Sequence, residues 1–190
     1  MNAMEKTFYT LLVYSENIAG MLNQITAVFT RRQLNIESLN VSASSIPNVH
    51  KYTITTWSDP DTIKKVVKQI EKKIDVLQAH FFTDDDIFLH EIALYKISTP
   101  IMQNDPMVSK IVRRAGAIIV EVNSVFSIVE KAGMTEEIIN LYEELQATGC
   151  MLQYVRSGRV AITKSSVERV TEFLEAREEG YRNKNQSQNG

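Results

Sequence analysis

The feature that most constrains the fold is a repeated order of hydrophobic patterns. Residues 7–82 alternate between stretches typical of strands and stretches typical of amphipathic helices, in the order βαββαβ. After an acidic break the same order returns in residues 88–163. Two consecutive units of this order predict an α+β chain with two tandem ferredoxin-like (βαββαβ) domains. Each would be an antiparallel sheet with two helices on one face.

In the first half, aromatic, β-branched and aliphatic residues gather in stretches that favour strands. Strands are expected at Thr7–Ser15, Asn35–Ser44, Val49–Trp57 and Asp75–Phe82. A helix is predicted over Gly20–Arg32, because its apolar residues fall on one helical face. Asp59 suits an N-cap and Pro60 a first helical position, so a second helix begins there. The buried stripe of that helix is predicted to contain Ile63, Val66, Val67, Ile70 and Ile74.

The same criteria apply to the second half. Strands are expected at Phe88–Ser98, Ala117–Asn123, Val125–Lys131, Met151–Val155 and Arg159–Thr163. Asp105-Pro106 begins a helix that ends near Arg114. Another helix, capped by Thr135, runs to Gln146, with Met134 and Ile139 placed for a hydrophobic staple. A last helix is predicted over Ser165–Ala176.

The acidic run Thr83–Asp86 interrupts the apolar pattern and predicts a linker over residues 83–87. The first domain is therefore expected over residues 5–82 and the second over residues 88–177. Residues 178–190 are polar and have almost nothing to bury, which predicts a disordered tail. An open sheet edge favours pairing with another chain, so side-by-side dimerisation is expected.

Composition narrows the class of function. A hydrophobic fraction of 44% and a charged fraction of 23% are typical of a soluble globular protein. The net charge of −2 argues against nucleic acid or an anionic membrane as the main partner. No apolar run reaches the roughly 18 residues of a membrane span. The single cysteine, Cys150, lies beside Met151 and is expected to be a buried thiol in a reducing cytoplasm.

The sequence offers no residue set for catalysis or metal binding. His50, His80 and His90 have no ligand spacing, so a metal site is not expected. The consecutive acidic residues 84–86 are typical of a solvated linker rather than a cation site. RNA-recognition modules share the βαββαβ order, and Tyr52 and Trp57 lie on an expected strand. Their glycine–aromatic pattern and basic face are missing, however, so RNA binding is not expected.

The most informative polar residues surround the first helix. Asn17 and Gly20 precede it, and Asn35 follows it. Backbone N–H groups at a helix start favour an anion, and a residue without a Cβ lets the anion approach. Taken singly, Gly20 suits a tight turn, Asn17 a cap and Asn35 a left-handed turn. Together they predict a site for a small zwitterion, such as an amino acid, at one rim of the sheet.

These motifs resemble those of the regulatory (small) subunit of acetolactate synthase, also called acetohydroxyacid synthase. The resemblance spans most of the chain. The stretches that look like the family's N-terminal ACT domain are Asn17-x-x-Gly20-x-Leu22, Phe29-x-Arg31-Arg32, Asn35-Ile-Glu-Ser-Leu39 and Ile74-Asp75-Val76. The stretches that resemble its C-terminal domain are His90-Glu-Ile-Ala-Leu-Tyr-Lys96-Ile, Ala117-Ile-Ile-Val-Glu-Val122 and Arg156-Ser-Gly158.

The resemblance implies a chain without catalytic activity, catalytic residues, bound metal or cofactor of its own. Thiamine diphosphate, Mg and FAD would belong to the catalytic (large) subunit, which the small subunit binds and activates. It also implies feedback inhibition by branched-chain amino acids, most often valine, which bind between two ACT domains of a homodimer. The effector-binding positions carried over are Asn17, Ile18, Ala19, Gly20, Met21 and Leu22 of one chain, facing Asn35 and Ile36 of the other.

Three positions depart from the family pattern. Ala19 stands where many members have proline, Gln24 where a basic residue is common, and Gln33 where glycine often follows the helix. A positive φ at Gln33 would strain the backbone. Two alternatives stay open. The chain could be an ACT-type module that senses another small molecule and regulates a different enzyme. It could also be an enzyme in its own right, although no catalytic residue set supports this.

Overall fold

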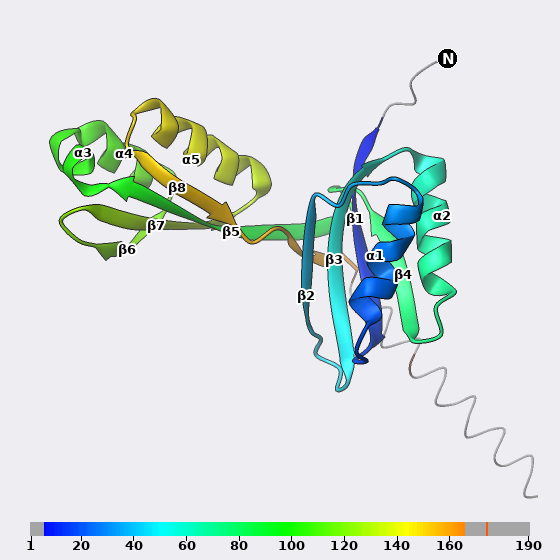
Figure 1. Ribbon diagram of the computed structural model, residues 1–190. Coiled ribbons are helices and arrows are strands. Elements are labelled where there is room, and N and C mark those ends of the chain that lie inside the picture. Colours follow the sequence, from blue (N-terminus) through cyan, green and yellow to red (C-terminus); the bar gives the residue numbers. More distant parts are fainter. Residues whose placement is uncertain (1–5, 166–173, 175–190) are drawn as a thin grey trace, which may run out of the picture. The chain divides into compact units, whose positions relative to one another are not determined.

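The computed structural model describes residues 6–165 and residue 174. Its two antiparallel sheets, each with helices, are shown in Figure 1. The chain divides into two compact units. Of the described residues, unit 1 comprises residues 6–88, 161–165 and 174, and unit 2 comprises Leu89–Val160. The α+β class with two ferredoxin-like sheets is confirmed.

Unit 1 contains a sheet with the strand order β2-β3-β1-β4. Its elements follow the expected order: β1 (Thr7–Glu16), α1 (Met21–Arg31), β2 (Ser38–Ala43), β3 (Val49–Ser58), α2 (Pro60–Glu71) and β4 (Val76–Phe82). The core lies between the sheet and the two helices, where Leu11, Ile25, Ile54 and Ile63 are fully buried. This arrangement brings the end of β1 and the start of α1 to one edge of the layer.

In helix α2 the predicted N-cap is confirmed, and the predicted burial of one residue is wrong. Asp59 caps it as expected, because its Oδ1 accepts hydrogen bonds from the backbone N–H groups of Asp61 (3.1 Å) and Thr62 (2.9 Å). The stripe from Ile63 to Ile70 is buried. Ile74, however, is 97% exposed. The helix ends at Glu71, so helical spacing no longer applies to Ile74.

Unit 2 contains the strand order β6-β7-β5-β8, and β9 also pairs with β5. The elements from residue 87 to residue 163 are β5 (Ile87–Ser98), α3 (Thr99–Asn104), α4 (Pro106–Arg114), β6 (Ile118–Val122), β7 (Phe126–Gly133), α5 (Thr135–Ala147), β8 (Met151–Arg156) and β9 (Val160–Thr163), of which β9 lies mostly in unit 1. The core residues of α4 and α5 pack against one face of the sheet. The short helix α3 was not expected, because six residues are too few to show a helical period.

Helix α5 begins one residue earlier than the predicted cap implies. Met134, not Thr135, is its N-cap residue, and the backbone N–H of Met134 donates to Glu137 Oε2 at 3.1 Å. The expected staple is therefore wrong. Met134 and Ile139 are 51% and 38% exposed, and Ile138 is the buried residue of this turn.

The end of unit 2 differs from the expected boundary at residue 177. Residues 161–165 group with unit 1, where Lys51 Nζ donates to the carbonyl of Ala161 at 2.9 Å. Lys164 Nζ donates to the carbonyl of Asp85 at 2.6 Å. Apart from Ser165 and Leu174, the helix expected over residues 165–176 lies outside the described residues, as does the tail expected over residues 178–190. None of the described helices has the length and apolarity needed to cross a membrane.

Candidate functional site

The turn between β1 and α1 contains most of the residues that the sequence singled out. Gly20 is the N-cap residue of α1, with φ 90° and ψ −7°. This left-handed conformation favours a residue without a Cβ. A Cβ added to Gly20 would meet no atom within 4 Å. The backbone conformation, rather than crowding inside the chain, therefore requires glycine, and the space beside it is open.

The first turn of α1 offers backbone donors to a ligand. Gly20 has no capping side chain, and the first turn contains no acidic residue. The N–H of Met21 makes a long bond to the carbonyl of Ile18 (3.4 Å), and that of Gln24 donates to the carbonyl of Gly20 (3.1 Å). Between them, the N–H groups of Leu22 and Asn23 have no acceptor among the described residues. Such a helix start has partial positive charge and favours a carboxylate.

The side chains of the turn divide into two groups. Ile18 and Leu22 are 45% and 44% exposed, and Asn17 and Ala19 are exposed as well. Met21 is only 1% exposed and belongs to the core of unit 1. Of this expected effector-binding residue, only the backbone can therefore face a ligand at the surface.

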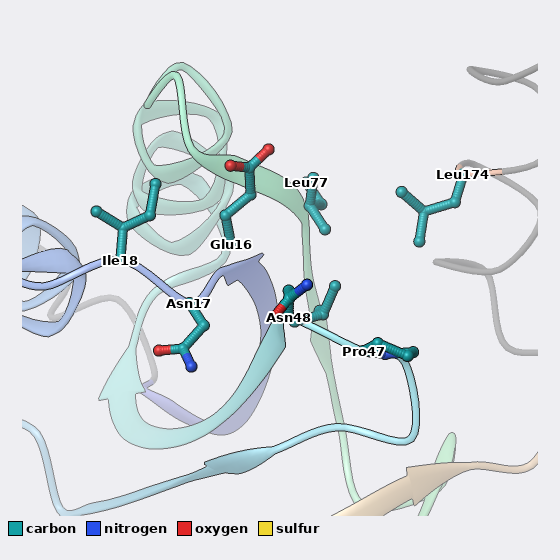
Figure 2. A pocket seen from close by; sticks show the side chains of 8 residues that line it. Glu16, Asn17, Ile18, Pro47, Asn48, Leu77 and Leu174 are labelled. Carbon is teal, nitrogen blue, oxygen red and sulfur yellow. The ribbon is translucent and has the colours of Figure 1, made fainter.

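A cavity of about 260 Å³ adjoins this turn. Glu16, Asn17 and Ile18 line it from the turn, and Asn48 and Val49 line it from the start of β3 (Figure 2). The N–H of Asn17 donates to the carbonyl of Asn48 at 2.8 Å. This hydrogen bond connects the turn to the β2–β3 hairpin and thereby fixes the position of the turn relative to the sheet.

Asn35 and Ile36 lie at the other end of the sheet, so the single rim expected from the sequence does not form within one chain. Asn17 binds Asn48 at the beginning of β3, whereas the carbonyl of Asn35 accepts from Thr56 Oγ1 at 2.6 Å near its end. The strand from residue 48 to residue 56 spans roughly 26 Å. The sequence did not reveal this separation. Helix α1 runs along the sheet between the two residues, so Asn17 lies before its start and Asn35 after its end, at the opposite end of the sheet.

The three departures from the family pattern lie near α1. Gln33 has φ 54°, so the left-handed conformation considered from the sequence is present at a residue with a Cβ. Gln24 and Ala19 are both exposed. Neither Ala19 nor Gln24 is part of the core of unit 1.

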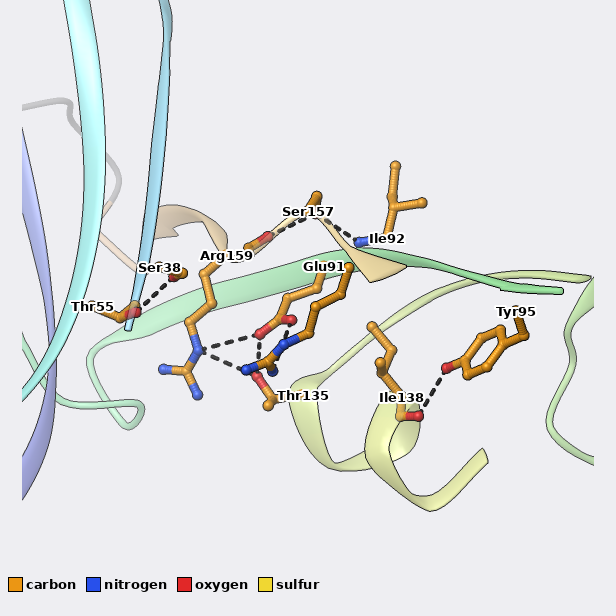
Figure 3. A network of polar contacts seen from close by, with 11 residues as sticks. Ser38, Thr55, Glu91, Ile92, Tyr95, Thr135, Ile138, Ser157 and Arg159 are labelled. Atoms are coloured by element: carbon orange, nitrogen blue, oxygen red, sulfur yellow. Dashed lines mark hydrogen bonds and ion pairs between the residues drawn. The ribbon is translucent and has the colours of Figure 1, made fainter. Parts of the chain in front are cut away.

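Unit 2 contains a buried ion pair that sequence reasoning missed. The side chains of Glu91 and Arg159 are 2% and 6% exposed, and Arg159 Nε lies 3.7 Å from Glu91 Oε1 (Figure 3). Thr135 Oγ1 donates to the same oxygen at 2.7 Å, and Arg156 Nη1 donates to Oε2 at 3.3 Å. Both carboxylate oxygens thus have partners, as a buried charge requires. The available signal was a carboxylate at an inward-facing position of an apolar strand.

The other residues discussed for their shifted pKa values are buried in the core of unit 2. Burial raises the pKa of Tyr95, with smaller contributions from Tyr154 and Glu91, and its hydroxyl donates to the carbonyl of Ile138 at 2.8 Å. Burial also raises the pKa of the Cys150 thiol, which is fully buried as expected. Within residues 6–165 and 174, no group of three His, Cys, Asp or Glu side chains could hold a metal ion.

Comparison with known proteins shows which protein family contains this turn. Residues 11–78 match the family model of the AHAS small subunit-like ACT domain, and residues 90–165 match that of the small subunit of acetolactate synthase. The acetolactate synthase small subunit of Buchnera aphidicola subsp. Baizongia pistaciae is 30% identical over 155 residues, which are 82% of this chain and 97% of the relative. This chain belongs to the acetolactate synthase small subunit family.

Other members of the family are also similar to this chain over most of its length. The acetolactate synthase small subunit of Bacillus subtilis is 29% identical over 168 residues, which are 87% of this chain and 95% of the relative. The crystal structure of the Thermotoga maritima acetolactate synthase small subunit shares the fold, with a TM-score of 0.75 and 22% identity over 84% of this chain and 99% of that one. The resemblance seen in the sequence is confirmed, and the turn at Gly20 lies inside the ACT domain of this family member.

Proposed function

We propose that this chain is a non-catalytic regulatory subunit of acetolactate synthase. It binds the catalytic (large) subunit, raises its activity and makes it sensitive to feedback inhibition by a branched-chain amino acid, with valine as the first candidate. The observation that carries this proposal is the uncapped start of α1 behind Gly20, inside a region that matches an ACT domain. The chain would act in the cytoplasm in branched-chain amino acid biosynthesis. Thiamine diphosphate, Mg and FAD would belong to its catalytic partner.

The proposed ligand geometry follows from the exposed groups of the turn. The effector carboxylate accepts hydrogen bonds from the N–H groups of Leu22 and Asn23, which have no acceptor among the described residues. Asn amides bind the ammonium group, and Ile18 and Leu22 contact the aliphatic side chain. The proposed site comprises Asn17, Ile18, Ala19, Gly20, the backbone of Met21, and Leu22 of one chain, with Asn35 and Ile36 of a second chain. A homodimer is required, because the two halves lie at opposite ends of one sheet.

Co-purification with the catalytic subunit tests the proposal directly. Acetolactate formation is assayed with the catalytic subunit alone, with this chain added, and with valine added to both. Activation by this chain and partial loss of activity with valine are expected. Calorimetric titration of the chain with valine, leucine and isoleucine then identifies the effector. No heat from any of the three, together with no inhibition, would contradict the proposed sensing.

A second candidate function is an ACT-type module that regulates a different enzyme. The exposed side chains of Ala19 and Gln24 favour it, since both depart from the family pattern beside the turn. Amino-acid binding without any activation of the acetolactate synthase catalytic subunit would support this second function over the first.

Substitution of Gly20 by aspartate tests the position of the site. The new carboxylate would lie beside that of the ligand, so Gly20→Asp is expected to weaken valine binding at least about tenfold, or 1.4 kcal/mol. Gly149→Asp is a matched control, because Gly149 is also left-handed (φ 71°) and also faces open space. Gly20→Asn separates charge from backbone strain. Normal valine binding by Gly20→Asp would show that the site lies elsewhere.

A further inference from the structure

Strand β4 forms one open edge of the sheet of unit 1. The strand order β2-β3-β1-β4 pairs β4 with β1 alone, and no described strand lies along its other side (Figure 1). Proteins usually protect an exposed strand edge with proline, lysine or another charged residue. Residues 76–82 contain no proline, lysine or carboxylate, and residues 79–82 pair with β1 without a bulge. The backbone along this stretch therefore suits the addition of a further strand.

A groove of about 370 Å³ lies between this edge and helix α2. Residues 79–82 line it from β4, and Lys64, Val67, Lys68 and Glu71 line it from α2; we call it the α2–β4 groove. Val67 and Ala79 are buried in the core of unit 1. The ring of Phe81 packs edge-on against Tyr9, with ring centroids 5.5 Å apart. The groove thus has an apolar base that the core holds in place.

The rim of the groove is mainly basic. Lys64 and Lys68 lie one helical turn apart and share a face of α2. Both are exposed, and among the described residues neither forms an ion pair. Of the described residues that line the groove, Glu71 is the only carboxylate. Two ammonium groups beside an apolar base favour a ligand with both carboxylates and an aliphatic side chain.

We propose that the α2–β4 groove binds an extended, acidic segment of another protein, which joins the sheet as a fifth strand beside β4. Backbone hydrogen bonds to β4 provide affinity, as in other cases of strand addition. Successive side chains of a strand point to opposite faces, so every second side chain of the segment faces α2. The aliphatic side chains of this set pack on Val67 and Phe81, and its carboxylates pair with Lys64 and Lys68.

The charge of the rim selects this ligand over others. A wholly apolar strand would desolvate Lys64 and Lys68 without a counterion, and a basic strand would be repelled. A free anion such as phosphate would leave the apolar base and the strand edge without a partner. Residues 79–82 pair with residues 10–13 of β1, away from the turn at Gly20. The inference therefore goes beyond the proposed effector site and does not depend on it.

A designed peptide tests the proposal on the full chain. The fluorescein-labelled heptapeptide Thr-Glu-Thr-Val-Thr-Glu-Thr places Glu, Val and Glu on one face, and its palindromic order suits either strand direction. Fluorescence anisotropy is expected to show saturable binding at least about tenfold tighter than that of the same peptide with Lys in place of Glu. Methylation of every backbone nitrogen is expected to abolish binding, because the peptide can then donate no backbone hydrogen bond. Equal affinities for the three peptides would overturn the proposal.

Charge reversal in the chain tests whether the peptide occupies this groove. The double variant Lys64→Glu/Lys68→Glu is expected to bind the acidic peptide at least about tenfold more weakly and the lysine peptide more tightly. Lys65→Glu/Lys110→Glu is the matched control, because it changes the net charge equally at exposed positions that do not line the groove. It should leave both affinities unchanged. Equal losses in the two double variants would mean that the peptide responds to net charge alone, and the proposal would fail.

Hydrogen exchange locates the added strand. The acidic peptide is expected to slow the exchange of outward-pointing amides in Val76–Phe82 and to leave those of β2, the other edge strand, unchanged. Slower exchange in β2 instead of β4 would place the peptide at the wrong edge and contradict the proposal. Strong protection of the outer side of β4 before any peptide is added would also contradict it, since a second copy or another segment of this chain would then already cover the strand.

Discussion

At Gly20 a single missing Cβ decides both the backbone and the chemistry of the turn. The left-handed conformation starts α1 without a side-chain cap, so the amides behind it stay open to an anion. At Gln33 the same region of φ is adopted by a residue with a Cβ, and nothing in the described chain explains why glycine is absent there. Both residues have positive φ, and only Gly20 adopts it without a Cβ.

Asp59 predicts a pH dependence at the start of α2. Hydrogen bonds with Thr62 hold the pKa of this carboxyl below 3.8. A lowered folded-state pKa stabilises the fold above 3.8, and that stabilisation is lost as pH falls through the folded value. Asp59→Asn keeps an acceptor but cannot ionise. The difference in Tm between the two proteins should be largest near neutral pH and shrink below 3.8, as measured by calorimetry.

The neighbouring carboxylate gives the control for this measurement. Asp61 lies in the same turn and donates its backbone N–H to the Asp59 side chain. Asp61→Asn should therefore leave the capping hydrogen bonds and their acid sensitivity in place. A Tm difference between wild type and Asp59→Asn that stays constant with pH would contradict the explanation.

The environment of Cys150 predicts a thiol of low reactivity. It is fully buried, lies 3.5 Å from the carbonyl of Leu145, and burial raises its pKa, so little thiolate forms at neutral pH. The native chain should react with a thiol reagent far more slowly than the unfolded chain does. Comparing modification rates with and without denaturant checks this, and equal rates would show that the thiol is accessible.

At the scale of the elements, the Glu91 network joins three segments of unit 2. Its side chains come from β5, from the start of α5 and from the stretch between the last residue of β8 (Arg156) and the residue before β9 (Arg159). The pair Arg114–Glu144 links α4 to α5 by the same kind of contact, but its side chains are 61% and 42% exposed. The two ion pairs are therefore expected to contribute different free energies to stability. Water screens the exposed Arg114–Glu144 pair but not the buried pair at Glu91.

Removing each carboxylate measures this difference. Glu91→Ala leaves the buried Arg159 guanidinium without its counterion and should lower the free energy of unfolding by about 3–5 kcal/mol. Glu144→Ala should cost only about 0–1 kcal/mol. Denaturant titration of both variants checks the ratio. Similar losses for the two variants would mean that the Glu91 network is screened like a surface pair.

Most elements could be predicted because hydrophobic periodicity records which side of each segment is buried. The exceptions have different causes. Helix α3 is too short to show a period, and the start of α5 is set by Glu137 and by the use of Thr135 in the Glu91 network. Ile74 continues a helical spacing after the helix has ended. Of the contacts involved, only the one between Thr135 and Glu91 joins residues distant in sequence, and local spacing could not reveal it.

At the scale of the whole molecule, the proposed effector site exists only in an assembly. One chain supplies the turn at Gly20, and its own Asn35 lies at the far end of β3. A ligand held by two copies stabilises the dimer that contains it, and each change in one equilibrium shifts the other.

Valine should therefore promote association of the chain. At a hundredfold excess over its Kd, a ligand that binds only the dimer stabilises it by about 2.7 kcal/mol per site. Sedimentation velocity across a dilution series, with and without valine, measures the shift. Asn35→Ala should reduce it, because one half of the site is weakened. Valine binding that does not depend on protein concentration would indicate a site complete within one chain.

The sequence by itself determined the order of the strands and of every described helix except α3, the caps with Asp59 and Asp105, and the family of this chain, since these depend on local spacing and residue type. Only the tertiary structure decided that Met21 is buried, that Glu91 has a buried counterion, and that Asn17 and Asn35 stand at opposite ends of the sheet. The physical reason is that burial and proximity are set by packing between segments far apart in the chain. We therefore propose that each chain contributes half of a small-molecule site, which a second copy completes.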